Sequence, residues 1–120
     1  MAGKTLVLGA STSPHRYSFV ATHQLLKKGH QVVLVGKSGG EVAGNVILTI
    51  WPTGEEIDTI TMYLAPHNQL KYYGNILESG ASRVIFNPGT ENDELENLTR
   101  AIGMEVEEAC TLVLLSTNQY

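Results

Sequence analysis

The apolar positions of this sequence fall into short runs that alternate with longer segments of helical periodicity. The runs are bounded by glycine or polar turn residues, and we predict buried strands at residues 4–9, 31–35 and 83–86. Between the first two runs, residues 17–28 place Val20 and Leu25 on one helical face. Gly29 follows as the expected stop of this helix. The strand–helix–strand pattern has the length of about 30 residues typical of a βαβ unit.

The second half of the sequence continues this alternation. We predict further strands at residues 45–50, 57–64 and 105–109. Pro66 is favoured in a first helical turn and begins a helix to about Glu78. Residues 36–44 are turn-like, and Asn92 is the predicted N-cap of another helix. The short apolar run at residues 111–115 is compatible with either a helix or a strand.

Together, these strands and helices predict an α/β fold in one domain, residues 1–120. The expected architecture is a three-layer Rossmann-like sandwich with a mostly parallel sheet of five to six strands. In such sheets, ligands bind outside the carboxyl ends of the strands, where the strand order reverses. This rule selects four loops, which are rich in glycine, proline and small polar residues: 9–18, 36–40, 63–67 and 87–90.

The composition supports a folded chain and narrows its partners. Of the 120 residues, 17% are charged and 42% are hydrophobic, which excludes an intrinsically disordered chain. The net charge is −4 and no basic stripe occurs, which excludes a general nucleic-acid binder. The single cysteine, Cys110, excludes an internal disulfide framework, and no spacing of residues predicts a metal site. With no signal peptide and no run of about 20 apolar residues, we expect a cytoplasmic protein without membrane partners.

The first of the four loops has the features of a phosphate site at a helix start. Gly9 lets the backbone turn tightly, and the free N–H groups of a helix N-terminus suit a phosphate. Ser11 and Ser18 add hydroxyl groups, and Arg16 adds positive charge. The loop is not a dinucleotide fingerprint, because Ser11 and Pro14 occupy two of its glycine positions, and it is not a P-loop. An ordinary strand–helix connection is the alternative.

Gly36 and Lys37, directly after the second predicted strand, bear on the choice of nucleotide. An NAD site places an acidic residue near this position, but the nearest acid is Glu41. A cation suits a ribose phosphate instead, as in NADP or coenzyme A. A solvated lysine in a turn is the alternative, and Lys37 does not by itself separate coenzyme A from NADP.

The pattern Gly-Ala-Ser-x-x-Pro-x-Arg-x-Ser, which starts at Gly9, resembles the CoA-binding domain family. These small Rossmann-like proteins are similar to the CoA-binding N-terminal domain of the succinyl-CoA synthetase alpha subunit. The resemblance extends over nearly the whole chain, through weaker matches at 29–30, 40–44, 57–58, 91–92 and 109–110. Gly36 and Lys37 depart from it, because many relatives have Asn-Pro after the second strand.

The resemblance implies that coenzyme A lies across the carboxyl edge of the sheet. Its pyrophosphate would face the backbone of the first loop, and its adenosine end would lie near Lys37. The loops that follow the central strand and the strand at 83–86 would border the ligand from the other side. The cofactor-binding residues expected on this basis are Gly9, Ala10, Ser11, Pro14, Arg16, Ser18, Gly36, Lys37, Ala65, Pro66, Asn87 and Pro88.

No catalytic constellation accompanies this predicted site. The resemblance places the phosphorylated histidine of the synthetases in another domain. His15 and His67 fall in loops at the ligand edge, but no orienting partner is recognisable for either. Cys110 is expected to be a small buried hydrophobe, with thiol exchange with coenzyme A as a minor hypothesis.

The sequence therefore predicts a coenzyme A- or acyl-CoA-binding protein without catalytic activity of its own. Two alternatives stay open: an NADP-binding module of an oxidoreductase, and a subunit that docks on a ligase-like partner. A homodimer is also compatible with the sequence, because two-fold dimers are the commonest oligomers of soluble proteins.

Overall fold

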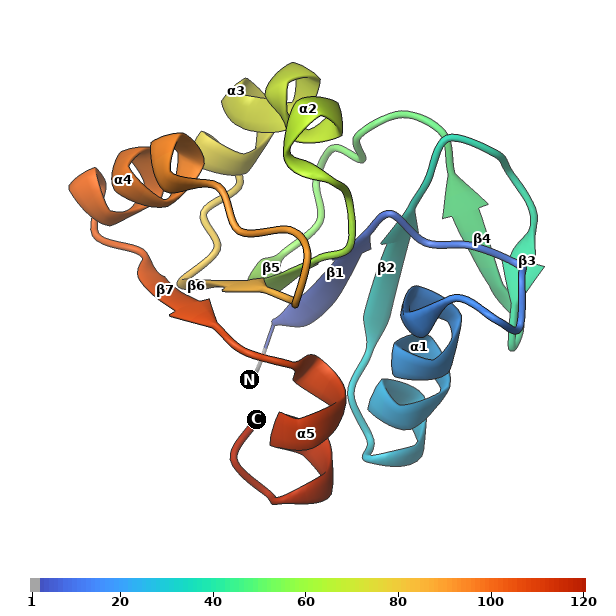
Figure 1. Ribbon diagram of the computed structural model, residues 1–120. Helices are drawn as coiled ribbons and strands as arrows, with labels where there is room; N and C mark the ends of the chain where they lie inside the picture. Colours follow the sequence, from blue (N-terminus) through green and yellow to red (C-terminus); the bar gives the residue numbers. More distant parts are fainter. Residues whose placement is uncertain (1–2) are drawn as a thin grey trace.

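The computed structural model describes residues 3–120 and consists of one seven-stranded sheet covered by helices on both faces (Figure 1). The strand order is β3-β4-β2-β1-β5-β6-β7. The strands are β1 Lys4–Leu8, β2 Val32–Val35, β3 Glu41–Val42, β4 Asn45–Leu48, β5 Ile57–Met62, β6 Arg83–Phe86 and β7 Glu105–Glu108. All neighbours pair in parallel except β3 and β4. The predicted α/β sandwich with a mostly parallel sheet is confirmed.

Strand β1 lies at the centre of the sheet, where the direction of strand order reverses. The chain passes from β1 to β2 on one side, and later returns to place β5 on the other side of β1. Crevices form outside the carboxyl ends of strands at such a switch point. The loops after β1, β2 and β5 therefore meet above one edge of the sheet.

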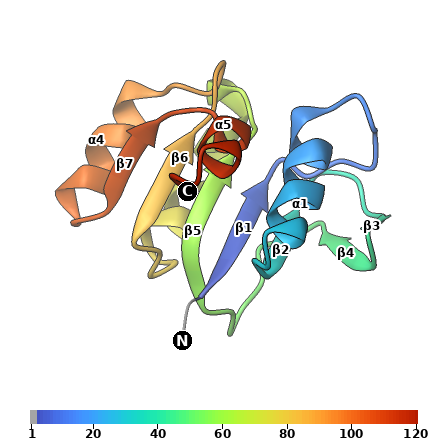
Figure 2. The ribbon, with the colours of Figure 1, turned by 90° about the horizontal axis from the view of Figure 1, so that it is seen from below.

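The helices form the two outer layers. They are α1 Tyr17–Lys27, α2 Pro66–Gln69, the 3-10 turn η1 Leu70–Tyr72, α3 Tyr73–Leu77, α4 Asp93–Ala101 and α5 Thr111–Ser116. Helices α1 and α5 cover one face of the sheet, and α2, α3 and α4 lie on the other (Figures 1 and 2). None of the helices in residues 3–120 has the length and apolar character needed to cross a membrane.

Alternating side chains of the central strands supply the two cores. Leu6 and Leu8 of β1 pack with Ile76 and Leu95 beneath α3 and α4. Val7 points the other way and packs with Leu25 of α1 and Leu115 of α5. Successive side chains of a strand point to opposite faces of the sheet, and here both faces are buried. The central strands are therefore continuous apolar runs in the sequence.

The structure corrects two details of the predicted elements and settles a third that the sequence left open. The sheet has seven strands rather than five to six, because the glycine-rich turn region contains the two-residue strand β3, which pairs antiparallel with β4. The helix predicted from Pro66 to Glu78 is interrupted by the 3-10 turn at Leu70–Tyr72. Residues 111–116 are helical, and Asn87 Oδ1 accepts the N–H of Thr111 at the helix start.

The predicted N-cap at Asn92 is confirmed. Its side-chain oxygen accepts the backbone N–H of Leu95 at 3.2 Å, and Glu96 accepts the N–H of Asn92 in return at 3.1 Å. This reciprocal pairing satisfies two of the free donors at the start of α4. It fixes the point at which the loop after β6 enters the helix.

Candidate functional site

A cleft of about 600 Å³ opens at the carboxyl ends of β1, β2 and β5. This volume lies within the range of about 300–1,000 Å³ typical of small-molecule sites. Its walls are the loop from β1 to α1, the turn after β2, and the segment from the end of β5 through η1. Pro88 and Thr90, after β6, complete it. The cleft therefore lies at the switch point of the sheet.

Nine of the twelve residues expected at the site line this cleft: Gly9, Ala10, Ser11, Arg16, Ser18, Gly36, Lys37, Ala65 and Pro88. They come from four separate loops that the parallel sheet brings to one edge. Pro14, Pro66 and Asn87 are not among the lining residues. Pro14 and Pro66 are exposed, and Asn87 is buried at 2% exposure.

Two glycines allow the loops around the cleft to approach closely. Gly9 has φ +101°, and a Cβ there would lie 3.0 Å from the carbonyl carbon of Tyr63. A Cβ on Gly36 would lie only 2.4 Å from the carbonyl oxygen of Ala10. Any other residue at Gly36 would push the turn after β2 away from the first loop. The loop after β1 is thus packed closely against both the segment after β5 and the turn after β2.

The pyrophosphate was expected to face the backbone of Gly9, Ala10 and Ser11 and the helix start near Ser18, and the first two of these N–H groups are already used within the protein. The N–H groups of Gly9 and Ala10 both donate to the carbonyl of Val35, at 2.8 and 2.9 Å, so they are not free to bind a phosphate. Among the described residues, no protein acceptor pairs with the backbone N–H groups of Ser11, Thr12, Tyr17 or Ser18. The backbone donors left free for an anion are thus in the middle of the loop and in the first turn of α1, where N–H groups lack helical partners.

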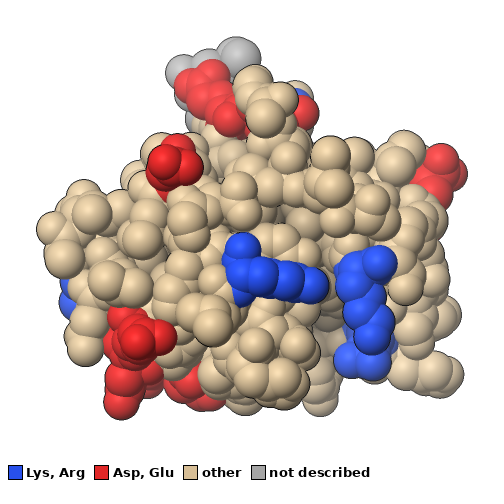
Figure 3. Space-filling model, turned by 90° about the horizontal axis from the view of Figure 1, so that it is seen from above, with Lys and Arg blue, Asp and Glu red and all other residues tan. Residues whose placement is uncertain are grey.

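The charge in the cleft is positive although the chain as a whole is negative. Arg16, Lys37 and Lys71 line it, and no Asp or Glu of residues 3–120 does so. The ion pairs formed within this part of the chain involve Lys4, Arg83 and Arg100, so the three cleft cations are left for a ligand. Figure 3 looks down on this edge of the sheet: basic side chains gather near the middle of the view, and acidic ones lie toward its rim.

Sequence reasoning missed most of the wall that follows β5. Asn68, Lys71 and Tyr72 line the cleft there, on or beside the interrupted helix. A regular helix from Pro66 gives no reason to single out these positions, and the 3-10 turn that presents them has no clear sequence signal. The other lining residues fall in the four predicted loops but were not singled out as contacts: Thr12, Tyr17, Ser38, Gly39, Tyr63, Leu64 and Thr90.

Tyr63 lies at the base of the cleft and turns its hydroxyl into the interior. Its oxygen is the one buried side-chain polar atom in residues 3–120 without a hydrogen-bond partner. The hydroxyls of Thr61 and Thr111 lie nearby but hydrogen-bond to each other at 2.8 Å. Burial outweighs their favourable effect on the phenolate and raises the pKa of Tyr63 to about 12. Tyr63 is therefore neutral at all physiological pH values.

Asn87 acts within the protein beneath the cleft. Its amide nitrogen donates to Thr61 Oγ1 and to the Met62 carbonyl, both at 2.8 Å. Its oxygen accepts the N–H of Thr111 at 2.8 Å. These three bonds join the ends of β5 and β6 to the start of α5. The side chain expected to face the ligand is thus used to hold the sheet edge together.

The chain matches the CoA binding domain family over residues 3–116. It belongs to this family. A crystal structure described as that of an uncharacterized protein shares 44% identity with this CoA-binding domain, covers 100% of the chain and 99% of its own, and has a TM-score of 0.96. The search of curated proteins gives no match.

More distant structures share the fold of this CoA-binding domain. A hypothetical protein from Pyrococcus horikoshii OT3 is 22% identical, with 96% of this chain and 82% of its own covered and a TM-score of 0.87. The structure of cell-free ID.343 from Thermus thermophilus is also 22% identical. The match covers 98% of this chain and 91% of the Thermus chain, with a TM-score of 0.85.

The groups in the cleft of this CoA-binding domain fit coenzyme A. Two kinds of donor converge on it: unpaired N–H groups at the start of α1, and the side chains of Arg16, Lys37 and Lys71. Both suit the pyrophosphate and ribose phosphate of the ligand. Leu64, Ala65 and Pro88 provide apolar wall on the other side, toward β5 and β6.

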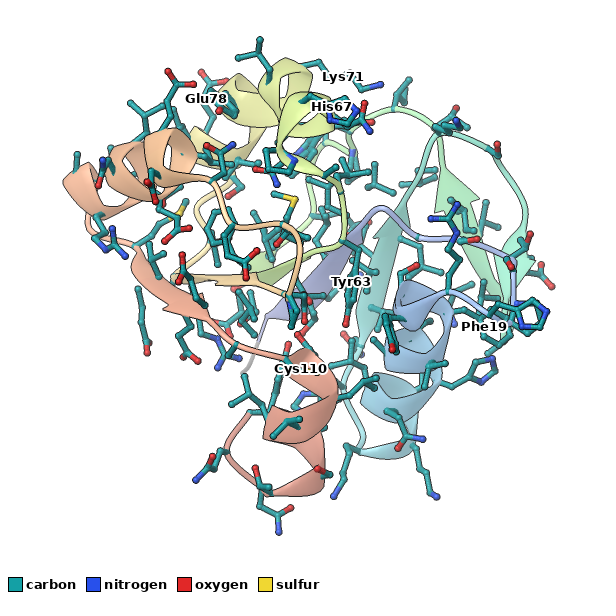
Figure 4. All side chains as sticks on the ribbon, in the orientation of Figure 1. Phe19, Tyr63, His67, Lys71, Glu78 and Cys110 are labelled. Atoms are coloured by element: carbon teal, nitrogen blue, oxygen red, sulfur yellow. The ribbon has the colours of Figure 1, made fainter. Side chains whose placement is uncertain are left out.

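The residues considered for chemistry lie outside the cleft lining. His67 lies on α2, and Cys110 lies directly before α5, below Tyr63 in the view of Figure 4. Neither these two nor His15 contributes to the cleft wall. Between α4 and β7, carboxylate oxygens of the exposed Asp93 and Glu108 and of the buried Glu96 lie within 4.8 Å of one another. A hydrogen bond with Glu96 and its charge raise the pKa of Glu108.

Proposed function

We propose that this protein binds coenzyme A or an acyl-CoA in the cleft and has no catalytic activity of its own. Membership of the CoA-binding domain family supports a CoA-binding role in general. One observation carries the assignment to the cleft: in a chain of net charge −4, three unpaired cations and the open start of α1 converge on a cavity without carboxylates. Such a cavity attracts a polyanion against the overall field of the protein.

The pyrophosphate of the ligand is assigned to the first loop. The N–H groups of Ser11 and Thr12 and the buried Ser18 at the start of α1 supply hydrogen-bond donors, and Arg16 supplies charge. The adenosine end, with its ribose phosphate, is assigned to Gly36 and Lys37 after β2. The pantetheine arm then leaves the cleft toward the side of β5 and β6.

NADP is the second candidate, because it also carries a pyrophosphate and a ribose phosphate. Lys37 favours both ligands equally over NAD, which needs an acidic residue near this place. The family match supports coenzyme A over NADP.

A thermal-unfolding series tests this assignment. The midpoint temperature is measured with coenzyme A, dephospho-coenzyme A, NADP and NAD at equal concentrations. A ligand at 100 times its dissociation constant adds about 2.7 kcal/mol to the free energy of unfolding. We expect a clear upward shift with coenzyme A, a smaller one with dephospho-coenzyme A, and none with NAD. A shift with NADP but none with coenzyme A would contradict the proposal.

A further inference from the structure

Lys71 is a cation on the wall of the cleft opposite Arg16, and no sequence motif marks it. It belongs to the 3-10 turn η1, in the segment that follows β5. In Figure 4 its side chain extends from this turn toward the β2 side of the molecule. In the space-filling view, basic side chains above this edge of the sheet form two neighbouring groups (Figure 3).

The side chain of Lys71 is exposed, and the turn that carries it is held by the residues around it. Its amine lies 5.3 Å from the ring centre of Tyr72, which is buried and packs near Trp51 with ring centres 6.1 Å apart. Gln69, fully buried, donates to the carbonyls of Leu64 and Thr90 at 2.8 Å and so anchors the preceding turn. The ring of Tyr72 attracts the amine of this exposed side chain.

Strand order decides which part of the ligand this amine meets. The segment after β5 adjoins the loop after β1, since a Cβ at Gly9 would lie 3.2 Å from the side chain of Leu64. The turn that holds Lys37 follows β2, on the far side of β1. This order pairs the segment that carries Lys71 with the first loop rather than with the turn that carries Lys37.

We propose that Lys71 binds the pyrophosphate of the ligand from the wall opposite Arg16, as a further ligand-binding residue. The inference rests on the proposed function, because it presumes a ligand with a pyrophosphate in the cleft. Arg16 and the start of α1 bind this group from one side, and Lys71 binds it from the other. A hydrogen bond between an ammonium group and a phosphate is charge-assisted, so it is stronger than one between neutral groups.

Isothermal titration of the Lys71→Met variant tests this assignment, because methionine keeps an apolar stem over Tyr72 and removes the charge. The exposed Lys27 at the end of α1 provides the control Lys27→Met. We expect the dissociation constant of coenzyme A to rise about five- to tenfold for Lys71→Met. The dissociation constant of dephospho-coenzyme A should rise by the same factor, because this ligand retains the pyrophosphate. Lys71→Arg should restore binding, and Lys27→Met should bind as the wild type does.

The outcomes separate this inference from the proposed function. If the wild-type protein binds neither coenzyme A nor dephospho-coenzyme A, the proposed function fails, and the role of Lys71 fails with it. If the wild type binds and Lys71→Met binds equally well, the role of Lys71 alone is wrong. A loss that occurs with coenzyme A but not with dephospho-coenzyme A would place Lys71 on the ribose phosphate and overturn the pyrophosphate assignment.

Discussion

Tyr63 contributes its ring to the cleft and its hydroxyl to the interior beneath. The adjacent polar groups are already used, because Thr61 and Thr111 bond to each other and Asn87 bonds to both of their segments. An unpartnered hydroxyl at such a place contributes little to stability at neutral pH. Its effect appears when the phenol can ionise.

We expect Tyr63→Phe to change the alkaline stability of the protein. The pKa of Tyr63 is about 12 in the folded chain and about 10 when unfolded. Below pH 10 both states keep the proton. As the pH rises from 10 to 12, the unfolded state ionises first, so the wild type loses stability. When the pH rises from 9 to 11, the free energy of unfolding in urea should fall by about 1 kcal/mol less for Tyr63→Phe than for the wild type.

Tyr73 and Tyr120, whose pKa values are also raised, remain in both proteins and cancel in the comparison. At pH 7, the free energy of unfolding of Tyr63→Phe should lie within about 0.5 kcal/mol of the wild-type value or above it. An equal alkaline loss in the two proteins would show that the Tyr63 hydroxyl is not buried as described.

At the scale of elements, the cleft depends on how closely the turn after β2 approaches the loop after β1. Gly36 makes this contact, with its backbone against the carbonyl of Ala10. The opposite wall depends on Gln69, which joins the segment after β5 to the loop before α4. Both walls are thus positioned by contacts between loops that lie far apart in the sequence.

Gly36→Ala should destabilise the protein, because the added Cβ would lie 2.4 Å from a backbone oxygen that cannot easily move. Overpacking of this kind costs about 1–3 kcal/mol in the free energy of unfolding. Gly74→Ala is the matched control: it lies in α3 with no atom within 4 Å of its Cβ position. Chemical denaturation should show this control to be neutral or stabilised by up to about 1 kcal/mol. Equal stability of the two variants would refute the close approach at Gly36.

The sequence predicts those elements whose burial or capping is local. The strands β1, β2 and β6 follow from apolar runs, and Asn92 is recognisable as an N-cap from its neighbours. Strand β3 is not predictable, since two residues carry no periodicity. The break at Leu70–Tyr72 depends on the tertiary bonds of Gln69, so local propensity does not reveal it.

The candidate site divides in the same way. Gly9, Arg16 and Gly36 follow strands recognisable from the sequence, and the switch-point rule brings them together. Lys71 lies nine residues after β5 on an irregular turn, and only the three-dimensional structure places it in the cleft. Asn87 follows a predicted strand, but its hydrogen bonds into the protein depend on the packing of α5, which the sequence left unassigned.

At the scale of the whole molecule, an acidic protein presents one basic, carboxylate-free cleft at its switch point. The family relationship, the unpaired donors at the start of α1 and the three cations agree on a ligand with several phosphates. The central claim is that this ligand is coenzyme A and that it binds in this cleft.

Isothermal titration with coenzyme A tests this claim most directly, on the wild type and on the variants Arg16→Ala, Lys37→Ala and Lys27→Ala. The account predicts one site per chain, a dissociation constant about tenfold higher for each cleft variant, and no change for Lys27→Ala on the distant end of α1. Absence of coenzyme A binding by the wild type, or full affinity in both cleft variants, would contradict it.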